Sequence, residues 1–91
     1  MKKEFMALMS NGLVKKDGDY DSKFNVYYHK TDNGWGATDE FTGRLMVFDK
    51  KTKKECQEAV VGTIEQINKI RNGENYLKGV INYQEMIEDV K

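Results

Sequence analysis

The middle of this 91-residue chain constrains its fold most, because three short runs typical of β-strands lead directly into a capped helix. Residues 23–30 are rich in aromatic and β-branched side chains, and an Asp-Asn-Gly break at 32–34 separates them from a second extended run that begins at Trp35. Another polar break at 39–43 ends in a glycine, which adopts the positive φ of a turn without strain, before a third run at 44–49. This order predicts a three-stranded antiparallel meander.

The segment that follows predicts one long helix. Thr52 precedes Glu55 by three residues, the spacing of a capping box that satisfies two free amides at a helix start. Apolar residues then recur at steps of three and four, which places them on one helix face that we expect to pack on the sheet. They are Cys56, Ala59, Val60, Ile64, Ile67 and Ile70. Asn72 and Gly73 can close the helix in a left-handed conformation, so about five turns are expected.

The N-terminal segment is compatible with two structures. Phe5, Leu8 and Met9 have helical spacing, and an Asn-Gly pair that follows them can end a helix, so we favour a short N-terminal helix. Phe5, Ala7 and Met9 also fit one face of a strand, which is the alternative. Residues 15–22 carry three aspartates and a glycine and are expected to form a mobile polar turn.

The C-terminal segment predicts a second short helix. Asn82 and Glu85 repeat the capping spacing ahead of further apolar residues. These are Tyr83, Met86, Ile87 and Val90. No repeat, low-complexity tract or linker interrupts the chain, so we expect residues 1–91 to form a single α+β domain. In this domain a three-stranded antiparallel meander packs on one long helix, with a short N-terminal helix and a short C-terminal helix.

Composition limits the functional classes. Fifteen basic and fifteen acidic residues balance, so no overall field attracts nucleic acid or a membrane. One cysteine excludes an internal disulfide, and no apolar run is long enough for a signal peptide core or a spanning helix. We therefore expect a cytoplasmic protein without membrane contact. The excess of lysine over arginine and the absence of proline suggest a low-GC Gram-positive bacterium or one of its phages.

Four lysines at the start of the long helix form the first candidate site. They are Lys50, Lys51, Lys53 and Lys54. Cations are mildly unfavourable beside the positive end of a helix dipole, so an anion is expected to be attracted there, either a nucleic-acid phosphate or an acidic protein surface. The alternative is that these side chains are simply the solvated end of a helix.

The sheet face away from the long helix is the second candidate site. If Phe24, Val26 and Tyr28 point to the core, then Asn25, Tyr27 and His29 point away from it. Two of the four apolar residues at 45–48 must also face outward, and this surface needs a cover from the same chain, a second subunit or another partner. The predicted partner-binding residues are Tyr27, His29, Trp35, Arg44 and Met46. Trp35 is either a binding hot spot or part of the core.

Catalytic chemistry is not indicated. His29 and Cys56 are the residue types of a nucleophilic pair, but Cys56 falls on the core stripe of the helix and no third orienting group is apparent. The aspartates at 17, 19 and 21 imitate the start of a calcium loop, but Ser22 and Tyr28 occupy the positions where that loop needs glycine and glutamate. We therefore expect no enzyme activity, no metal and no cofactor.

Two local resemblances involve the meander and the helix start, about half of the chain. Thr52-Lys53-Lys54-Glu55-Cys56, followed by Ala59, resembles the start of the second helix of double-stranded-RNA-binding domains, where a serine and paired lysines meet phosphates. The same block resembles the arm-binding domain of phage integrases, in which three strands enter a DNA groove and a helix follows. Both resemblances imply nucleic-acid binding through the outer sheet face and the lysines.

Three functional hypotheses follow. The leading one is a non-catalytic protein-binding module, a phage-encoded inhibitor that occludes a host enzyme such as a defence nuclease, with a homodimer as a possible assembly. The alternative is a nucleic-acid-binding module that uses the outer sheet face and Lys50 to Lys54. The third is a small enzyme or a ligand-sequestering protein.

Overall fold

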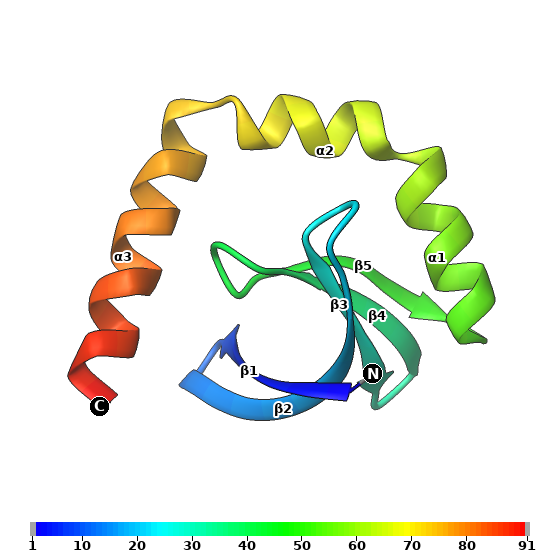
Figure 1. The fold of residues 1–91 in the computed structure, drawn as a ribbon, viewed down its shortest axis with the longest axis horizontal. Coiled ribbons are helices and arrows are strands. Elements are labelled where there is room, and N and C mark those ends of the chain that lie inside the picture. The colour runs from blue at the N-terminus through cyan, green and yellow to red at the C-terminus, as the bar shows by residue number, and fades with distance from the viewer. Residues whose placement is uncertain (1, 91) are drawn as a thin grey trace.

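The computed structural model describes residues 2–90 and contains one antiparallel sheet followed by three helices (Figure 1). The strands are β1 (Lys2–Met9), β2 (Gly12–Asp21), β3 (Val26–Thr31), β4 (Gly34–Asp39) and β5 (Leu45–Lys50), and the helices are α1 (Lys53–Gly62), α2 (Ile64–Arg71) and α3 (Glu74–Val90). The strands are neighbours in chain order. The fold is therefore α+β, but the predicted three-stranded meander is wrong because the sheet has five strands. In the described part of the chain, no helix is both long and apolar enough to span a membrane.

The two extra strands lie in the N-terminal part of the chain, where the sequence favours a short helix and then a polar turn. β1 and β2 pair from Lys2↔Asp19 to Met9↔Gly12, so two residues connect them, and Gly12 has a φ of +112°. The predicted N-terminal helix is therefore wrong, and the strand alternative is right. Most of the predicted polar turn at 15–22 lies in β2. The Asn-Gly pair that predicts a helix end lies instead at the β1–β2 hairpin turn. Glycine is common both at helix ends and in hairpin turns, because it adopts a positive φ without strain.

The predicted direction of the β3 side chains is correct. Val26 and Tyr28 are buried in the core against α1, so Tyr27 and His29 lie on the opposite, concave face. The N-terminal strand covers that face, since the sheet curls until the Phe5 ring stacks on the Tyr27 ring with centroids 4.4 Å apart. Phe24 packs against the same core from the β2–β3 turn, where Asn25 has a φ of 58° and is not part of a strand.

The predicted single long helix is wrong, because the helix is interrupted at Thr63. This residue leaves the helical region with φ −113° and ψ 15°, and its hydroxyl donates to the Ala59 carbonyl 2.7 Å away. The preceding Gly62 lowers helix stability at the same point. The break turns α2 away from α1, and the three helices form an arch around the sheet (Figure 1).

The start of α1 and most of the predicted apolar stripe, which continues into α2, agree with the prediction. The Thr52 hydroxyl accepts a hydrogen bond from the Glu55 amide at 3.1 Å. The Glu55 carboxylate accepts from the backbone amide of Lys51 at 3.2 Å, and not from that of Thr52 as a capping box would. The stripe residues Cys56, Val60 and Ile67 are buried, and Ala59 and Ile64 are partly buried against them. Ile70 is the exception, because it is 55% exposed.

Helix α3 has 17 residues, so the prediction of a short C-terminal helix starting near Asn82 is wrong. The side chains that it turns toward the sheet are Tyr76, Val80, Tyr83 and Ile87, which have regular helical spacing. The Tyr83 hydroxyl donates to the Met6 carbonyl at the free edge of β1. Close contact at this point requires Gly43, since a Cβ atom there would lie 2.4 Å from Cε1 of Tyr83.

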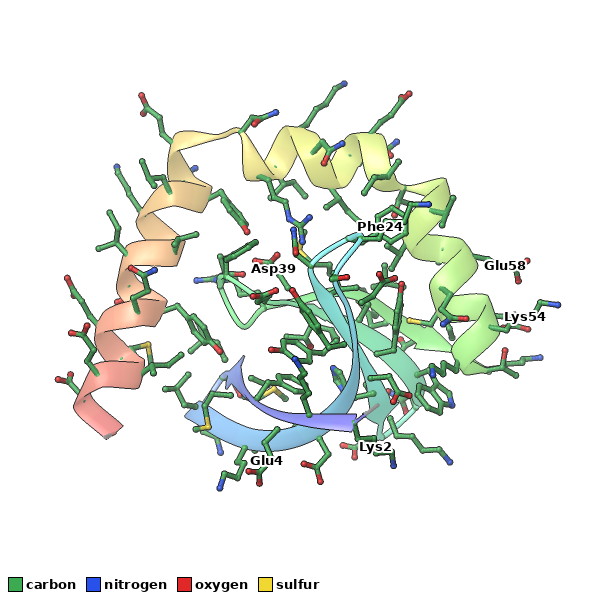
Figure 2. The ribbon with its side chains drawn as sticks, in the orientation of Figure 1. Lys2, Glu4, Phe24, Asp39, Lys54 and Glu58 are labelled. Atoms are coloured by element: carbon green, nitrogen blue, oxygen red, sulfur yellow. The ribbon has the colours of Figure 1, made fainter. Side chains whose placement is uncertain are left out.

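A buried carboxylate joins the arch to the sheet. Asp39, at the end of β4, accepts hydrogen bonds from Arg71 of α2, from Tyr76 of α3 and from the amide and hydroxyl of Thr42. Figure 2 shows Asp39 between the sheet and the helices. Because ionised side chains are rarely buried unless they are paired, this cluster fixes where α2 meets α3.

Candidate binding site

Strand β5 is irregular, and this irregularity positions the candidate site. Its partners in β4 are Trp35↔Lys50, Ala37↔Val47 and Thr38↔Leu45, with register shifts between these pairs. Met46 is consequently an extra residue, and Asp49 adopts a φ of 61°. Such β-bulges re-aim side chains relative to a regular strand.

The bulges divide the apolar run of β5 between two environments. Val47 is buried in the core, and Met46 packs partly against it. Leu45 is 42% exposed and Phe48 is 58% exposed. Two of the four apolar residues therefore leave the core, as the sequence predicts, and both belong to a strand with only one neighbour in the sheet of residues 2–90.

Both edges of the sheet resist the addition of another strand. On β1, the Leu8 amide donates to the Gly43 carbonyl at 2.7 Å, and the Met6 carbonyl accepts from Tyr83. On β5, the bulges interrupt the regular series of backbone groups that a further strand would need. A partner is therefore expected to contact side chains of β5 and not its backbone edge.

Two hollows flank Phe48. The first, which we call the helix groove, lies between β5 and the helices, has a volume of about 430 Å³ and is lined by Met46, Phe48, Ala59, Ile67 and Ile70 among others. Its lining is mainly apolar. An apolar groove beside exposed Phe48 and Ile70 is suited to receive apolar side chains of another molecule.

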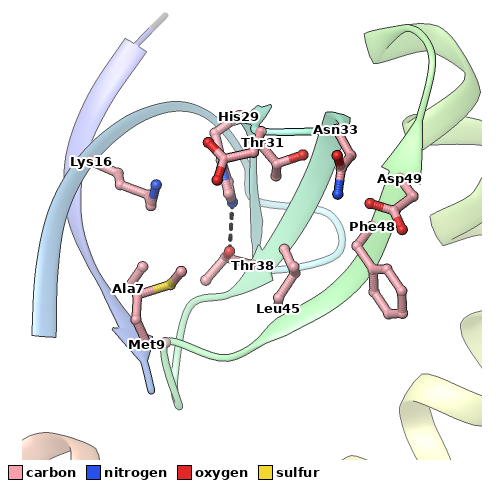
Figure 3. A pocket seen from close by; sticks show the side chains of 12 residues that line it. Ala7, Met9, Lys16, His29, Thr31, Asn33, Thr38, Leu45, Phe48 and Asp49 are labelled. Atoms are coloured by element: carbon pink, nitrogen blue, oxygen red, sulfur yellow. Dashed lines mark hydrogen bonds between the residues drawn. The ribbon is translucent and has the colours of Figure 1, made fainter. Parts of the chain in front are cut away.

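The second hollow, which we call the concave pocket, lies inside the curled sheet and has a volume of about 350 Å³ (Figure 3). Ala7 and Met9 line one side, and Leu45 and Phe48 line another. Since Phe48 contributes to both hollows, the exposed side chains of β5 form a continuous surface with them. We call Met9, Leu45, Met46, Phe48 and Ile70 together the β5 surface.

The predicted partner-binding residues do not all lie on one face. Tyr27 is half-buried between Phe5 and Tyr20, with ring centroids 4.4 and 5.0 Å away, and burial raises the pKa of its hydroxyl. Met46 lies on the other face of the sheet, against the core beneath α1. Tyr27 and Met46 therefore do not form the single contact surface that strand alternation suggests.

His29 lies at the wall of the concave pocket and is only 5% exposed. Its Nδ1 is 3.1 Å from the Lys30 carbonyl, which can only accept, so this nitrogen carries the proton. The Nε2 atom then accepts from the Thr38 hydroxyl 2.6 Å away. Burial lowers the pKa of His29, because the charged imidazolium loses hydration there.

The other two predicted partner-binding residues differ in exposure. Trp35 is half-buried against the core, with the Lys30 ammonium 6.0 Å from its ring, so most of its role is packing. Arg44 is exposed in the β4–β5 loop, next to Leu45.

The lysine cluster is partly neutralised. The Lys53 ammonium lies 2.6 Å from an Asp19 carboxylate oxygen and lowers the pKa of that carboxyl. Lys50 is half-buried and lines the helix groove. Lys51 and Lys54 are exposed, and Figure 2 shows Lys54 on the outer side of α1. Of the four lysines, Lys50 therefore borders the β5 surface through the helix groove.

His29 and Cys56 lie on opposite faces of the sheet and do not form a pair. Cys56 is fully buried in the core with Tyr28, the neighbour of His29 in β3. Burial raises the pKa of the Cys56 thiol to about 11. The thiolate is therefore scarce at neutral pH, and this cysteine is a core residue.

The sequence indicated part of this site. The apolar run at 45–48 signalled exposed side chains, but Leu45 and Phe48 were not named as binding residues, because their direction depends on bulges that appear only when β4 and β5 pair. The helical periodicity places Ile70 on the core stripe, whereas its side chain is 55% exposed. No protein-family model matches this chain, and no curated protein or solved structure matches it either.

Proposed function

We propose that this protein is a non-catalytic, cytoplasmic protein-binding module that acts by covering a surface of its partner. The observation that carries the proposal is Phe48, a large aromatic side chain that is 58% exposed between two hollows. Aromatic anchors surrounded by pockets and apolar neighbours are typical of the centre of a protein interface.

The arrangement supports a defined mode of contact. Leu45 and Phe48 project from β5, and apolar side chains of the partner would enter the helix groove beside Ile70. Lys50 lines this groove, and Lys51 and Lys54 are exposed near the start of α1, so these charges would steer an acidic partner surface. The partner class to test first is the one that the sequence suggests, a host enzyme such as a defence nuclease, which would be blocked by a phage-encoded inhibitor.

The experiment is a comparison of two matched double variants. Leu45→Asp with Phe48→Asp places charges on the β5 surface. Leu77→Asp with Ile81→Asp places the same charges on α3, where these residues are 61% and 49% exposed. Each variant is used for capture from host lysate, and every captured protein is purified and titrated calorimetrically against the wild-type protein and both variants.

The proposal requires that the β5 variant lose binding by about 100-fold or more, as expected for two central interface positions, while the α3 variant binds like the wild type. Thermal unfolding of both variants verifies that they remain folded. Equal binding of a purified partner by the wild type and the β5 variant would show that the contact lies elsewhere.

The nucleic-acid alternative is favoured by one observation, the exposure of Lys51 and Lys54 beside the start of α1. A salt titration separates the two functions. Four phosphate contacts would lower affinity roughly tenfold for each doubling of salt, whereas an apolar protein interface responds weakly. A steep salt dependence that is lost in Lys51→Gln with Lys54→Gln would replace the leading proposal by this one.

A further inference from the structure

The concave pocket has chemical features that a protein-binding surface does not need. Its inner wall includes polar side chains from three strands: Lys16 of β2, His29 and Thr31 of β3, and Thr38 of β4. Its apolar lining includes Ala7 and Met9 on one side and Leu45 on another. A concave site with few convergent polar groups on an apolar wall is typical of a small-molecule site.

Lys16 is a cation that points into the sheet. It pairs across the strands with Phe5, so it shares the concave face with that ring, and Figure 3 shows its side chain directed toward the pocket. Its neighbour Lys15 lies on the other face and forms an ion pair with Glu4 at 3.5 Å. Within residues 2–90, Lys16 forms no such pair. Its ammonium can therefore bind an anionic group of a ligand.

Thr31 adds a second available group. Its hydroxyl oxygen is fully buried and has no hydrogen-bond partner among residues 2–90. Buried polar atoms are rarely left unpaired, because each costs about 1–3 kcal/mol. Thr31 belongs to the pocket wall, and a ligand in the pocket can satisfy this hydroxyl once the Thr31 side chain turns toward it.

The hydrogen bonds of His29 show which kind of ligand group is complementary. Both of its ring nitrogens are already bonded, to the Lys30 carbonyl and to the Thr38 hydroxyl. The groups that remain are the Lys16 ammonium, the Thr31 hydroxyl and the amide of Asn33. All three can donate hydrogen bonds, and one of them is positively charged, so the complementary group is an anionic acceptor.

The acidic residues of the pocket limit the charge of the ligand. Asp32 and Asp49 also line it, and both are solvent-exposed. Their charges are screened by water, but they would repel a ligand with several negative charges. A single carboxylate meets the donors at lower cost than a phosphate or a dicarboxylate does.

We propose that the concave pocket binds a small monocarboxylate whose short aliphatic body lies against Ala7, Met9 and Leu45, and whose carboxylate meets Lys16 and Thr31. A volume of about 350 Å³ accommodates a body of a few carbon atoms together with its carboxylate. The polar contacts of this site are separate from the proposed protein interface, because Lys16 and Thr31 do not belong to the β5 surface, whereas Met9 and Leu45 line both.

Nuclear magnetic resonance tests the proposal with three probes of similar shape: butyrate, butyramide and butylammonium. His29 is the single histidine of the chain, so its ring signals report on the pocket without overlap. Butyrate should give saturable shifts of the His29, Thr31 and Leu45 signals and should raise the pKa of His29, since a nearby anion stabilises the imidazolium beside Lys16, Asp32 and Asp49. Butyramide and butylammonium should bind at least about tenfold more weakly, because they lack the charge-assisted bond.

Two neighbouring lysines provide the matched variants. Lys16→Met removes the ammonium but keeps the length of the side chain, and should weaken butyrate binding by about tenfold or more. Lys15→Met makes the same change on the other face and should leave binding unchanged. Equal binding of butyrate and butyramide, tighter binding of butylammonium, unchanged affinity in Lys16→Met, or no saturable shift of the pocket signals would each overturn the proposal.

Discussion

Arg71, in the last turn of α2, binds Asp39, at the end of β4, across 32 residues of sequence. Its Nη2 lies 2.6 Å from Oδ1 of Asp39, and its Nε lies 3.2 Å from the same oxygen. The Asp39 side chain is 0% exposed and that of Arg71 is 16% exposed. The same guanidinium donates to the Asn25 carbonyl at 3.2 Å, so a single side chain connects α2 with the end of β4 and with the β2–β3 turn.

Removal of Arg71 should therefore destabilise the whole fold. Arg71→Ala leaves the Asp39 carboxylate buried without its cation, which we expect to lower the free energy of unfolding by about 3–5 kcal/mol. Urea denaturation monitored by circular dichroism measures the loss. Lys69→Ala, an exposed change in the same turn, should cost less than about 0.5 kcal/mol. A loss below about 1 kcal/mol for Arg71→Ala would contradict the proposed role of the pair.

Stability should decrease in mildly acidic solution because of His29. Its pKa is lowered in the folded state by burial, so between this value and the unfolded value near 6.5 the unfolded chain binds more protons. The stabilisation is complete above pH 6.5 and is lost as the pH falls toward the folded pKa, by about 1.4 kcal/mol for each unit of difference. Urea denaturation between pH 8 and pH 5 should show this decrease.

A His29→Gln variant serves as the control for the pH effect, since its side chain does not titrate. It should show a flatter dependence between pH 8 and pH 5, even if its overall stability is lower. Lys16→Met should move the His29 titration to higher pH, because the charge of Lys16 lowers the pKa of His29. Identical pH profiles for His29→Gln and the wild type would disprove the assignment to His29.

Cys56 should be unreactive in the native protein. Its thiol is fully buried and burial raises its pKa to about 11, so both access and thiolate formation are restricted. Labelling with a thiol-specific chromogenic disulfide at pH 7.5 should be slower by a factor of about 100 or more than in denaturant, where the single cysteine reacts completely. Rapid labelling under native conditions would place Cys56 at the surface.

Two glycines should respond to alanine in opposite directions. Gly43 has a φ of 68°, and a Cβ atom there would lie 2.4 Å from the Tyr83 ring, so Gly43→Ala should destabilise the fold by more than about 1 kcal/mol. Gly62 lies at the end of α1 with nothing within 4 Å of its Cβ position, so Gly62→Ala should stabilise the fold by up to about 1 kcal/mol. Thermal unfolding of both variants checks the signs, and a stabilising Gly43→Ala would contradict the close contact between the β4–β5 loop and α3.

Local patterns in the sequence determined the strands at 23–49, the inward direction of Val26 and Tyr28, and the Thr52 cap of α1. Each of these depends on neighbours within a few residues, which set backbone preference and side-chain alternation. Local patterns did not distinguish a helix from a strand in the N-terminal segment. Phe5 and Met9 fit a helix as well as a strand, and pairing with β2 resolves this ambiguity.

Long-range contacts decided the rest. The bulges of β5 exist only in its pairing with β4, so neither the exposure of Phe48 nor the groove beside it follows from the order of residues 45–48. The angle of the helical arch likewise depends on the interruption at Thr63 and on the ion pair between Arg71 and Asp39. These two side chains meet only in the folded chain. The periodicity of apolar residues specifies which side chains can be buried. Strand register and ion pairs between residues far apart in the sequence then determine which apolar side chains stay exposed and available for binding.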